Sequence, residues 1–230
     1  MRSIRREQNQ ESTRREIKAY AWRQIAADGV NSVSLGAIAR SMNLTTPALY
    51  RYFLKRDDLI QALTVDAYRS FLSSLQNALE ACPPDDQACR FRTLNRAYYK
   101  WAIDHPPQYQ IIFGIHSASS IQNDQVADIA DRCLLLLLVV LDKACQAGQL
   151  NPQVEIVLSD GMQARLEQFI CQDHNFPVNV VYLALVSWSF LNGVTSLELS
   201  QKYSLILENQ THEFFNLELE RFMRSIGFLQ

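Results

Sequence analysis

The chain has 230 residues, of which 48% are hydrophobic and 20% charged, and its formal net charge is −2 at pH 7. This apolar content can form a folded core, which excludes an intrinsically disordered chain. The seven glycines and seven prolines are about half of average usage, too few for a turn-rich sandwich or barrel, so we expect an all-α fold.

The charge is unevenly distributed along the chain. Residues 1–56 contain eleven Lys/Arg and four Asp/Glu, a local net charge of +7, whereas residues 57–230 carry −9. A nucleic-acid-binding head joined to a non-binding body has this charge pattern. A solvated basic helix would give the same count, so charge alone does not decide between the two.

The sequence indicates a cytoplasmic protein. Its longest unbroken apolar run is Leu134–Leu141, whereas a membrane-spanning helix needs about twenty residues. The basic N-terminus is not followed by an apolar stretch, so we expect no signal peptide and no membrane partner. The cysteines are odd in number and without a C-x-x-C pair, which favours reduced thiols. They are Cys82, Cys89, Cys133, Cys145 and Cys171.

Apolar spacing predicts a first helix over residues 13–28, stopped by Gly29 in a left-handed cap. We expect the basic arm before it, residues 1–11, to be disordered.

Residues 34–53 have the plan of a helix-turn-helix inside the basic segment. Ser34 caps a helix over residues 34–42, a turn begins at Asn43, and Thr46 caps a second helix over residues 46–52.

Breaks at Pro83-Pro84 and Pro106-Pro107 and the apolar patterns between them predict the later helices. Residues 151–176 have the least regular apolar pattern, and we expect one helix within them. The expected ranges are 57–81, 86–104, a short segment ending at 113, 125–147, 162–171, 178–199 and 205–226.

The last two helices carry excess apolar surface. Because residues 178–199 are apolar nearly all round, we expect them to be buried on every side, as in a four-helix bundle completed by a second copy. A core helix in a compact monomer is the alternative. The expected interface residues are Val180, Ala184, Leu191, Phe215, Leu219 and Phe222.

The sequence resembles the N-terminal domain of the TetR family over about residues 13–63. The matching segments are Gly29–Ser34, Ile38-Ala39, Ala48–Phe53 and Arg56–Leu59. Two positions depart from the family pattern: Asn43 stands where Gly is usual, and tolerates the same backbone, and Arg56 stands where Lys is usual.

A weaker resemblance continues into the C-terminal half. Tyr99–Ala102 with His105-Pro106, and Trp188 with Asn192-Gly193, are similar to a TetR subgroup with a Trp-x-x-x-His-Gly signature. Asn192 replaces the His of that signature. Residues 151–176 look like an insertion.

The resemblance implies a dimeric, ligand-responsive transcriptional regulator, most often a repressor, that binds an inverted-repeat operator. It implies no enzymatic activity and no cofactor. Its partners would be double-stranded DNA, a small-molecule effector and a second copy. The expected division is an arm (1–11), a DNA-binding domain (12–60) and an effector-binding and dimerisation domain (61–230).

Within the recognition helix, residues 46–52, Arg51 and Thr46 are the expected base-edge contacts, because Arg pairs bidentately with guanine and Thr offers a hydroxyl or a methyl group. Tyr50 and Tyr52 would contact phosphates. The full set of expected DNA-binding residues is Ser34, Thr45, Thr46, Ala48, Tyr50, Arg51, Tyr52, Lys55 and Arg56.

Aromatic residues in the body are candidates for a ligand pocket, although plain core packing would explain them equally well. With the residues of the subgroup signature, the expected pocket set is Tyr98, Trp101, Phe113, Trp188 and Asn192.

Other reactive side chains form no recognisable site. The four histidines, among them His116, have no metal-ligand spacing, and no phosphate-binding or nucleophile motif is present. Cys133 and Cys145 have no flanking cationic cluster, which favours inert thiols. Two rival classes stay open: an all-α enzyme whose basic head binds substrate or RNA, and a dimeric scaffold.

Overall fold

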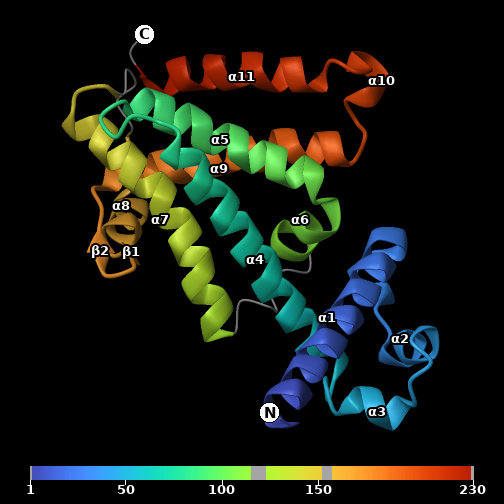
Figure 1. Ribbon diagram of the computed structural model, residues 1–230. Coiled ribbons are helices and arrows are strands. Elements are labelled where there is room, and N and C mark those ends of the chain that lie inside the picture. Colours follow the sequence, from blue (N-terminus) through green and yellow to red (C-terminus); the bar gives the residue numbers. More distant parts are fainter. Residues whose placement is uncertain (1, 115–122, 152–156, 229–230) are drawn as a thin grey trace. The chain divides into compact units, whose positions relative to one another are not determined.

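The structure, a computed structural model, describes residues 2–114, 123–151 and 157–228 (Figure 1). These residues are predominantly helical, which confirms the all-α expectation. They divide into two compact units: residues 2–68, 105–114 and 123–126 form the first, and the other described residues form the second. The boundary expected after residue 60 lies inside a continuous helix.

The first unit contains the helix-turn-helix. Helix α6 contacts both α1 and the 3₁₀ helix η1, so the unit combines the N-terminal helices with a segment from the middle of the chain. Its elements are α1 (Arg2–Asp28), η1 (Val30–Ser32), α2 (Leu35–Ser41), α3 (Thr46–Tyr50), the first half of α4 (Arg56–Glu80), α6 (Pro106–Phe113) and the start of α7 (Asp124–Gln146).

Helix α1 begins at Arg2 rather than at residue 13, so residues 2–11 are helical and not the disordered arm expected. The segment contains neither Gly nor Pro and is rich in Arg, Glu and Gln, which are good helix formers. Its residues 8–11 are exposed. Exposed positions carry no apolar periodicity, which is why the pattern did not predict helix over residues 8–11.

The second unit is formed around α5, α9 and α11, which contact one another pairwise (Figure 1). Its elements are the end of α4, α5 (Gln87–Asp104), most of α7, α8 (Asp160–Glu167), β1 (Ile170–Cys171), β2 (His174–Asn175), α9 (Val178–Leu199), α10 (Ser204–Leu207) and α11 (Thr211–Ile226).

An aromatic stack and an ion pair join α5 to α11. The Tyr99 ring lies parallel to that of Phe215 with centroids 3.8 Å apart. The Tyr99 hydroxyl donates to Glu198 on α9, and burial raises its pKa, so the phenol stays protonated. At the periphery, Arg92 donates to both carboxylate oxygens of Glu220, over 2.5 and 3.0 Å.

Two predicted helices differ from the structure because non-glycine residues adopt positive φ. The helix expected over 162–171 ends at Glu167, and a hairpin follows it, turning at Gln172 and Asp173 with φ of 50° and 61°. Positive φ at both central residues suits a tight hairpin turn. The final helix, expected as one from residue 205, is divided into α10 and α11, with Glu208 at φ 48° between them.

Helix α9 is, among the described residues, the one helix long and apolar enough by composition to cross a membrane. In the structure it packs against α5, α8 and α11, and Val180, Ser187 and Thr195 on it are fully buried. One side of this helix is therefore packed into the protein core.

The residues expected at a dimer interface lie mostly inside the second unit, which corrects that expectation. Phe222 is half-buried and stacks on Phe190 with centroids 4.3 Å apart. The other five have exposed fractions of 5% or less: Val180, Ala184, Leu191, Phe215 and Leu219. These side chains have no surface to offer a second copy, because they are buried in the core of the second unit.

Leu219→Ala should therefore lower the free energy of unfolding by about 2–5 kcal/mol, as expected for truncation of a fully buried leucine. Leu217 is the matched control on the same helix, with 62% of its side chain exposed, and Leu217→Ala should change the value by less than about 0.5 kcal/mol. Urea denaturation followed by circular dichroism measures both. Equal effects would contradict this assignment of the two faces of α11.

Candidate nucleic-acid interface

Capping side chains fix the two short helices of the helix-turn-helix. Ser34, as predicted, is the N-cap of α2, and its hydroxyl accepts from the Ala37 N–H at 3.3 Å. The cap of α3 is Thr45 and not the predicted Thr46, since the Thr45 hydroxyl accepts from the Ala48 N–H at 3.3 Å. A residue outside the helix in extended conformation is needed for this bond, and Thr46 is already helical.

Helix α2 ends in a Schellman motif centred on Asn43. The Leu44 N–H donates to the Ala39 carbonyl over 2.9 Å, and the Asn43 N–H donates to the Arg40 carbonyl over 3.1 Å. Asn43 has φ of 53°, the left-handed conformation that this motif requires. Asn43 therefore takes the position expected of a glycine, and directs the chain from α2 into α3.

Helix α1 holds the N-terminal side of α2. The Gln24 side-chain oxygen accepts from the Ser34 N–H over 3.0 Å, and the Gln24 carbonyl accepts from the Ser32 hydroxyl over 3.1 Å. Gly29, where α1 ends, has φ of 80° with ψ of 174°, an extended glycine conformation rather than the left-handed cap expected. These contacts fix the segment that leads into the helix-turn-helix.

Arg56 holds the same segment from the start of α4. Its Nε donates to the Val33 carbonyl over 3.1 Å, and an Nη donates to the Val30 carbonyl over 2.6 Å. We predicted a phosphate contact for this residue, but its guanidinium is committed to backbone carbonyls. The side chain therefore positions α2 relative to α4.

The N-terminus of α4 is closed by half of a capping box. The Asp58 carboxylate accepts from the Lys55 N–H over 3.0 Å. The Lys55 side chain is exposed, so its ammonium group remains accessible beside this helix terminus.

Two further cations of the basic segment make internal contacts. The Arg14 guanidinium lies 4.4 Å from the centroid of the Phe53 ring and donates to the Tyr52 carbonyl over 3.4 Å. Lys18 forms an ion pair with Asp66 on α4 over 2.7 Å. Some of the positive charges in residues 1–56 therefore stabilise contacts within the first unit and are not free to bind a ligand at the surface.

The short helix α3 buries one face and exposes the others. Leu49 is fully buried and Phe53 just after the helix is 1% exposed. Thr46 with Tyr50, and Pro47 with Arg51, are four residues apart and so form two neighbouring rows. The expected contacts with exposed side chains are Ser34, Thr45, Thr46, Tyr50, Arg51 and Lys55, whereas Ala48, Tyr52 and Arg56 are half-buried.

One exposed cation beside this surface was not in our predicted set. Arg40 lies in the last turn of α2, which packs directly against α3. Within the described part of the chain, Arg40, Arg51 and Lys55 take part in no ion pair. The sequence did contain a signal for Arg40, because this residue lies on the first of the two short helices of the helix-turn-helix.

In the second unit, the structure brings together part of the expected pocket set. Tyr98 on α5 is buried, and its hydroxyl donates to the Asn192 side-chain oxygen on α9 over 3.2 Å. Phe71 packs against both Tyr98 and Trp101, with centroids 5.4 and 4.8 Å away. The Asn at the position of the family's His thus has a defined partner on α5.

The remaining members of that set are placed differently. Trp101 is buried and donates to the Ser70 hydroxyl over 3.1 Å. Trp188 is 44% exposed, and Phe113 belongs to the first unit, where its ring is 5.1 Å from that of Tyr109. His116 lies outside the described residues. The structure therefore supports a polar pair at Tyr98 and Asn192 more directly than a single aromatic cavity.

Reactive side chains in the second unit do not assemble a metal site. Among the residues that the structure describes, no three His, Cys, Asp or Glu side chains are grouped to hold an ion. Burial raises the pKa of the Cys133 thiol to about 12 and also raises that of Cys145. Both thiols are therefore protonated at neutral pH, in line with the expectation of inert cysteines.

Comparison with known proteins identifies both halves of the chain. The family model described as "Bacterial regulatory proteins, tetR family" matches residues 17–63, and "Tetracyclin repressor-like, C-terminal domain" matches residues 91–222. The HTH-type transcriptional regulator Rv1816 of Mycobacterium tuberculosis is 26% identical over 206 residues, which cover 86% of each protein.

Solved structures are similar over nearly the whole chain. The crystal structure of the protein SCO4313 is 34% identical with a TM-score of 0.74, covering 94% of this chain and 97% of its own. A tetR-family protein from Rhodococcus RHA1 is 18% identical with a TM-score of 0.68, covering 94% and 98%. At 18% identity, the likeness to the Rhodococcus protein shows the fold alone. The resemblance seen in the sequence is confirmed.

Arg56→Ala should lower the free energy of unfolding by about 1–3 kcal/mol, because two part-buried carbonyls lose a charged donor. Arg51→Ala, which removes an exposed cation five residues earlier, should change it by less than about 0.5 kcal/mol. Thermal or urea unfolding of the two variants gives the comparison. If both were equally stable, the Arg56 contacts would not hold the segment in place.

Proposed function

Because the chain belongs to the TetR family of bacterial transcriptional regulators, we propose that it is a ligand-responsive repressor that binds an inverted-repeat operator as a homodimer. Members of this family bind DNA and are not enzymes. The observation that carries the proposal is the exposed face of α3. Arg14 on α1 contacts Phe53 just after this helix, and Gln24 and Arg56 hold the segment that leads into α2.

Arg51 and Thr46 read base edges in this proposal, and the side chains around them contact phosphates. Both residues are exposed, on neighbouring rows of α3. Ser34, Thr45, Tyr50, Tyr52 and Lys55 fix the position of the helix on the duplex. Arg40 joins this group, because it is exposed on the helix that packs against α3. Arg56 acts indirectly, through the backbone that it holds.

Selection of the purified chain on a random duplex library tests the repressor proposal. We expect enrichment of an inverted repeat whose half-sites are about one helical turn, or a multiple of it, apart. A folded protein that enriches no sequence would contradict the proposal and favour the scaffold or enzyme class.

Arg51→Ala should relax base preference at one position of each half-site, at a cost of about 1–3 kcal/mol for the preferred base, and leave nonspecific binding nearly intact. Fluorescence anisotropy with the selected operator and its single-base variants measures this. Arg165→Ala, at an exposed position on α8, is the control and should leave the operator profile unchanged. Uniform weakening on every duplex would instead make Arg51 a phosphate contact.

A second copy would cover the exposed apolar side of α9. Leu185 is 46% exposed and Trp188, one turn later, is 44% exposed, although the opposite side of the helix is buried. Large apolar side chains at adjacent exposed positions favour a protein contact, and a two-fold axis would place the same residues of both copies together. The interface is thus proposed at the exposed apolar residues of α9, and not at the buried residues expected from the sequence.

Trp188→Glu should convert the dimer into a monomer, because the new carboxylates would meet each other near the two-fold axis. Sedimentation velocity at micromolar concentration measures the change. Met162→Glu, at a 52%-exposed position on α8, is the matched control and should remain dimeric. A Trp188→Glu chain that stays folded and dimeric would move the interface away from α9.

The effector is proposed to bind between α5 and α9, near the Tyr98–Asn192 hydrogen bond. The Asn95 side-chain oxygen on α5 and the Thr195 hydroxyl on α9 are buried and have no hydrogen-bond partner among the described residues. Since unpaired buried polar atoms are costly, a ligand with an apolar body and a polar group would suit this seam.

One protein with this fold has a known ligand with both an apolar and a polar part. FadR of Bacillus subtilis, 12% identical with a TM-score of 0.64, was crystallised with stearoyl-CoA, although at that identity the likeness shows only the fold. Regulation would follow if the ligand favoured one arrangement of the dimer over another. Such compounds should release the protein from the operator duplex that the library selection yields, and this release can be measured directly.

A further inference from the structure

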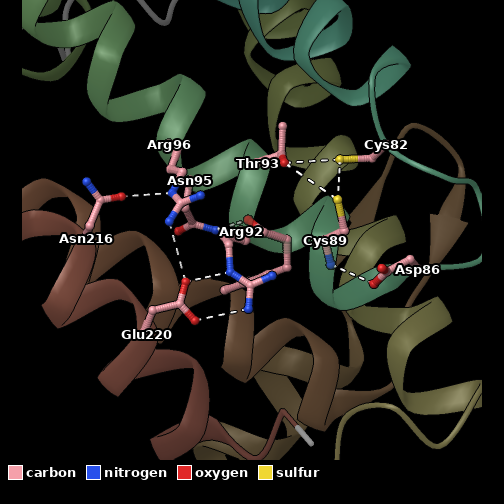
Figure 2. A network of polar contacts seen from close by, with 10 residues as sticks. Cys82, Asp86, Cys89, Arg92, Thr93, Asn95, Arg96, Asn216 and Glu220 are labelled. Carbon is pink, nitrogen blue, oxygen red and sulfur yellow. Dashed lines mark hydrogen bonds and ion pairs between the residues drawn. The ribbon is translucent and has the colours of Figure 1, made fainter. Parts of the chain in front are cut away.

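The turn between α4 and α5 brings two cysteines together. Cys82 follows the end of α4, and Cys89 lies in the first turn of α5. Pro83-Pro84 and Asp86 reverse the chain between them, and the two sulfur atoms are 2.8 Å apart (Figure 2). A disulfide bond is about 2.05 Å long, so less than about 1 Å of further approach would join them.

The surroundings of the two thiols differ. The Cys82 thiol is buried and donates to the Thr93 hydroxyl oxygen over 3.1 Å. Because that proton is directed at Thr93, the bond between the sulfurs is donated by Cys89. Cys89 is half-exposed, and its N–H donates to the Asp86 carboxylate over 2.8 Å. An oxidant from solution therefore reaches Cys89 first, and the buried Cys82 sulfur is close enough to react with the oxidised Cys89.

We propose that Cys82 and Cys89 are a redox-sensing dithiol that a hydroperoxide converts into a reversible intramolecular disulfide. The Cys89 thiolate attacks the terminal peroxide oxygen, the O–O bond breaks, and an alcohol leaves with the thiol proton. The Cys82 sulfur then attacks the Cys89 sulfenic acid, and hydroxide leaves with the Cys82 proton as water. Two thiols lose two electrons in total, and the peroxide gains them.

Hydrogen bonding to Cys82 and burial raise the pKa of Cys89. At neutral pH little of it is thiolate, so the first step is slow and requires sustained oxidant. Its rate should rise with pH in the neutral to mildly alkaline range, because only the thiolate attacks. This behaviour fits a switch that responds to oxidative stress rather than to ordinary fluctuations.

The bridge would act on the contact between α5 and α11. Arg92 and Arg96 lie three and seven residues after Cys89, on the same face of α5, and both reach Glu220 on α11 (Figure 2). Arg96 also donates to the Asn216 side chain over 2.9 Å. Closing the disulfide moves the first turn of α5, and with it the base of this polar network. An effect on operator affinity rests on the function proposed above.

Mass spectrometry of the full chain tests the bridge. Both cysteines lie in one tryptic peptide, residues 70–90, because no Lys or Arg occurs between Arg69 and Arg90. After treatment with hydrogen peroxide and alkylation, we expect this peptide unalkylated and two hydrogen atoms lighter, and alkylated again after dithiothreitol. Cys89→Ser should abolish the loss, and Cys145→Ser, at another half-buried thiol, should not.

Alkylation of both sulfurs after a peroxide dose that fully oxidises free glutathione would overturn the proposal, as would disulfide-linked dimers in place of the internal bridge. A second measurement tests regulation: operator affinity of the oxidised chain should differ several-fold from that of the reduced chain, and Cys89→Ser should remove the difference. A bridge that forms with unchanged affinity would overturn the regulatory role. Failure of the reduced chain to bind any operator concerns only the proposed function.

Discussion

The surface proposed to read DNA depends on a helix too short to stand alone. Helix α3 has five residues, far below the roughly 12–15 at which isolated helices become even marginally stable. Its shape is imposed by tertiary contacts: Leu49 and Phe53 are buried beneath it, Asn43 sets the turn before it, and Arg56 fixes the segment that leads into α2. Changes in these internal residues would therefore disturb the outer face of α3 without touching DNA.

Most of the fold could be predicted from apolar periodicity and from the positions of Pro and Gly. The helix expected over residues 178–199 has those bounds in the structure, and α4, α5 and α7 differ from the expected ranges by a residue or so at each end. The failures have two physical origins. Asp173 and Glu208 turn the chain at positive φ without glycine, and residues 8–11 of α1 are exposed and so generate no apolar pattern.

The candidate site was predictable in outline, but the use of individual side chains was not. The motif located α3 and its buried Leu49, whereas nothing in the sequence distinguishes Arg51, which is exposed, from Arg56, which binds two carbonyls. On α9 an apolar residue occurs on every face, so the pattern could not show which face is inward. The pairing of Cys82 with Cys89 depends on the reversal at Pro83-Pro84, which residue spacing does not encode.

The internal cations have a consequence for the salt dependence of DNA binding. Each phosphate that a protein contacts releases condensed counterions, and the slope of log affinity against log salt is about −0.9 per contact. Of the eleven basic residues in positions 1–56, Arg14, Lys18 and Arg56 face an aromatic ring, a carboxylate and backbone carbonyls. The formal charge of this segment therefore overstates the number of counterions that binding would release.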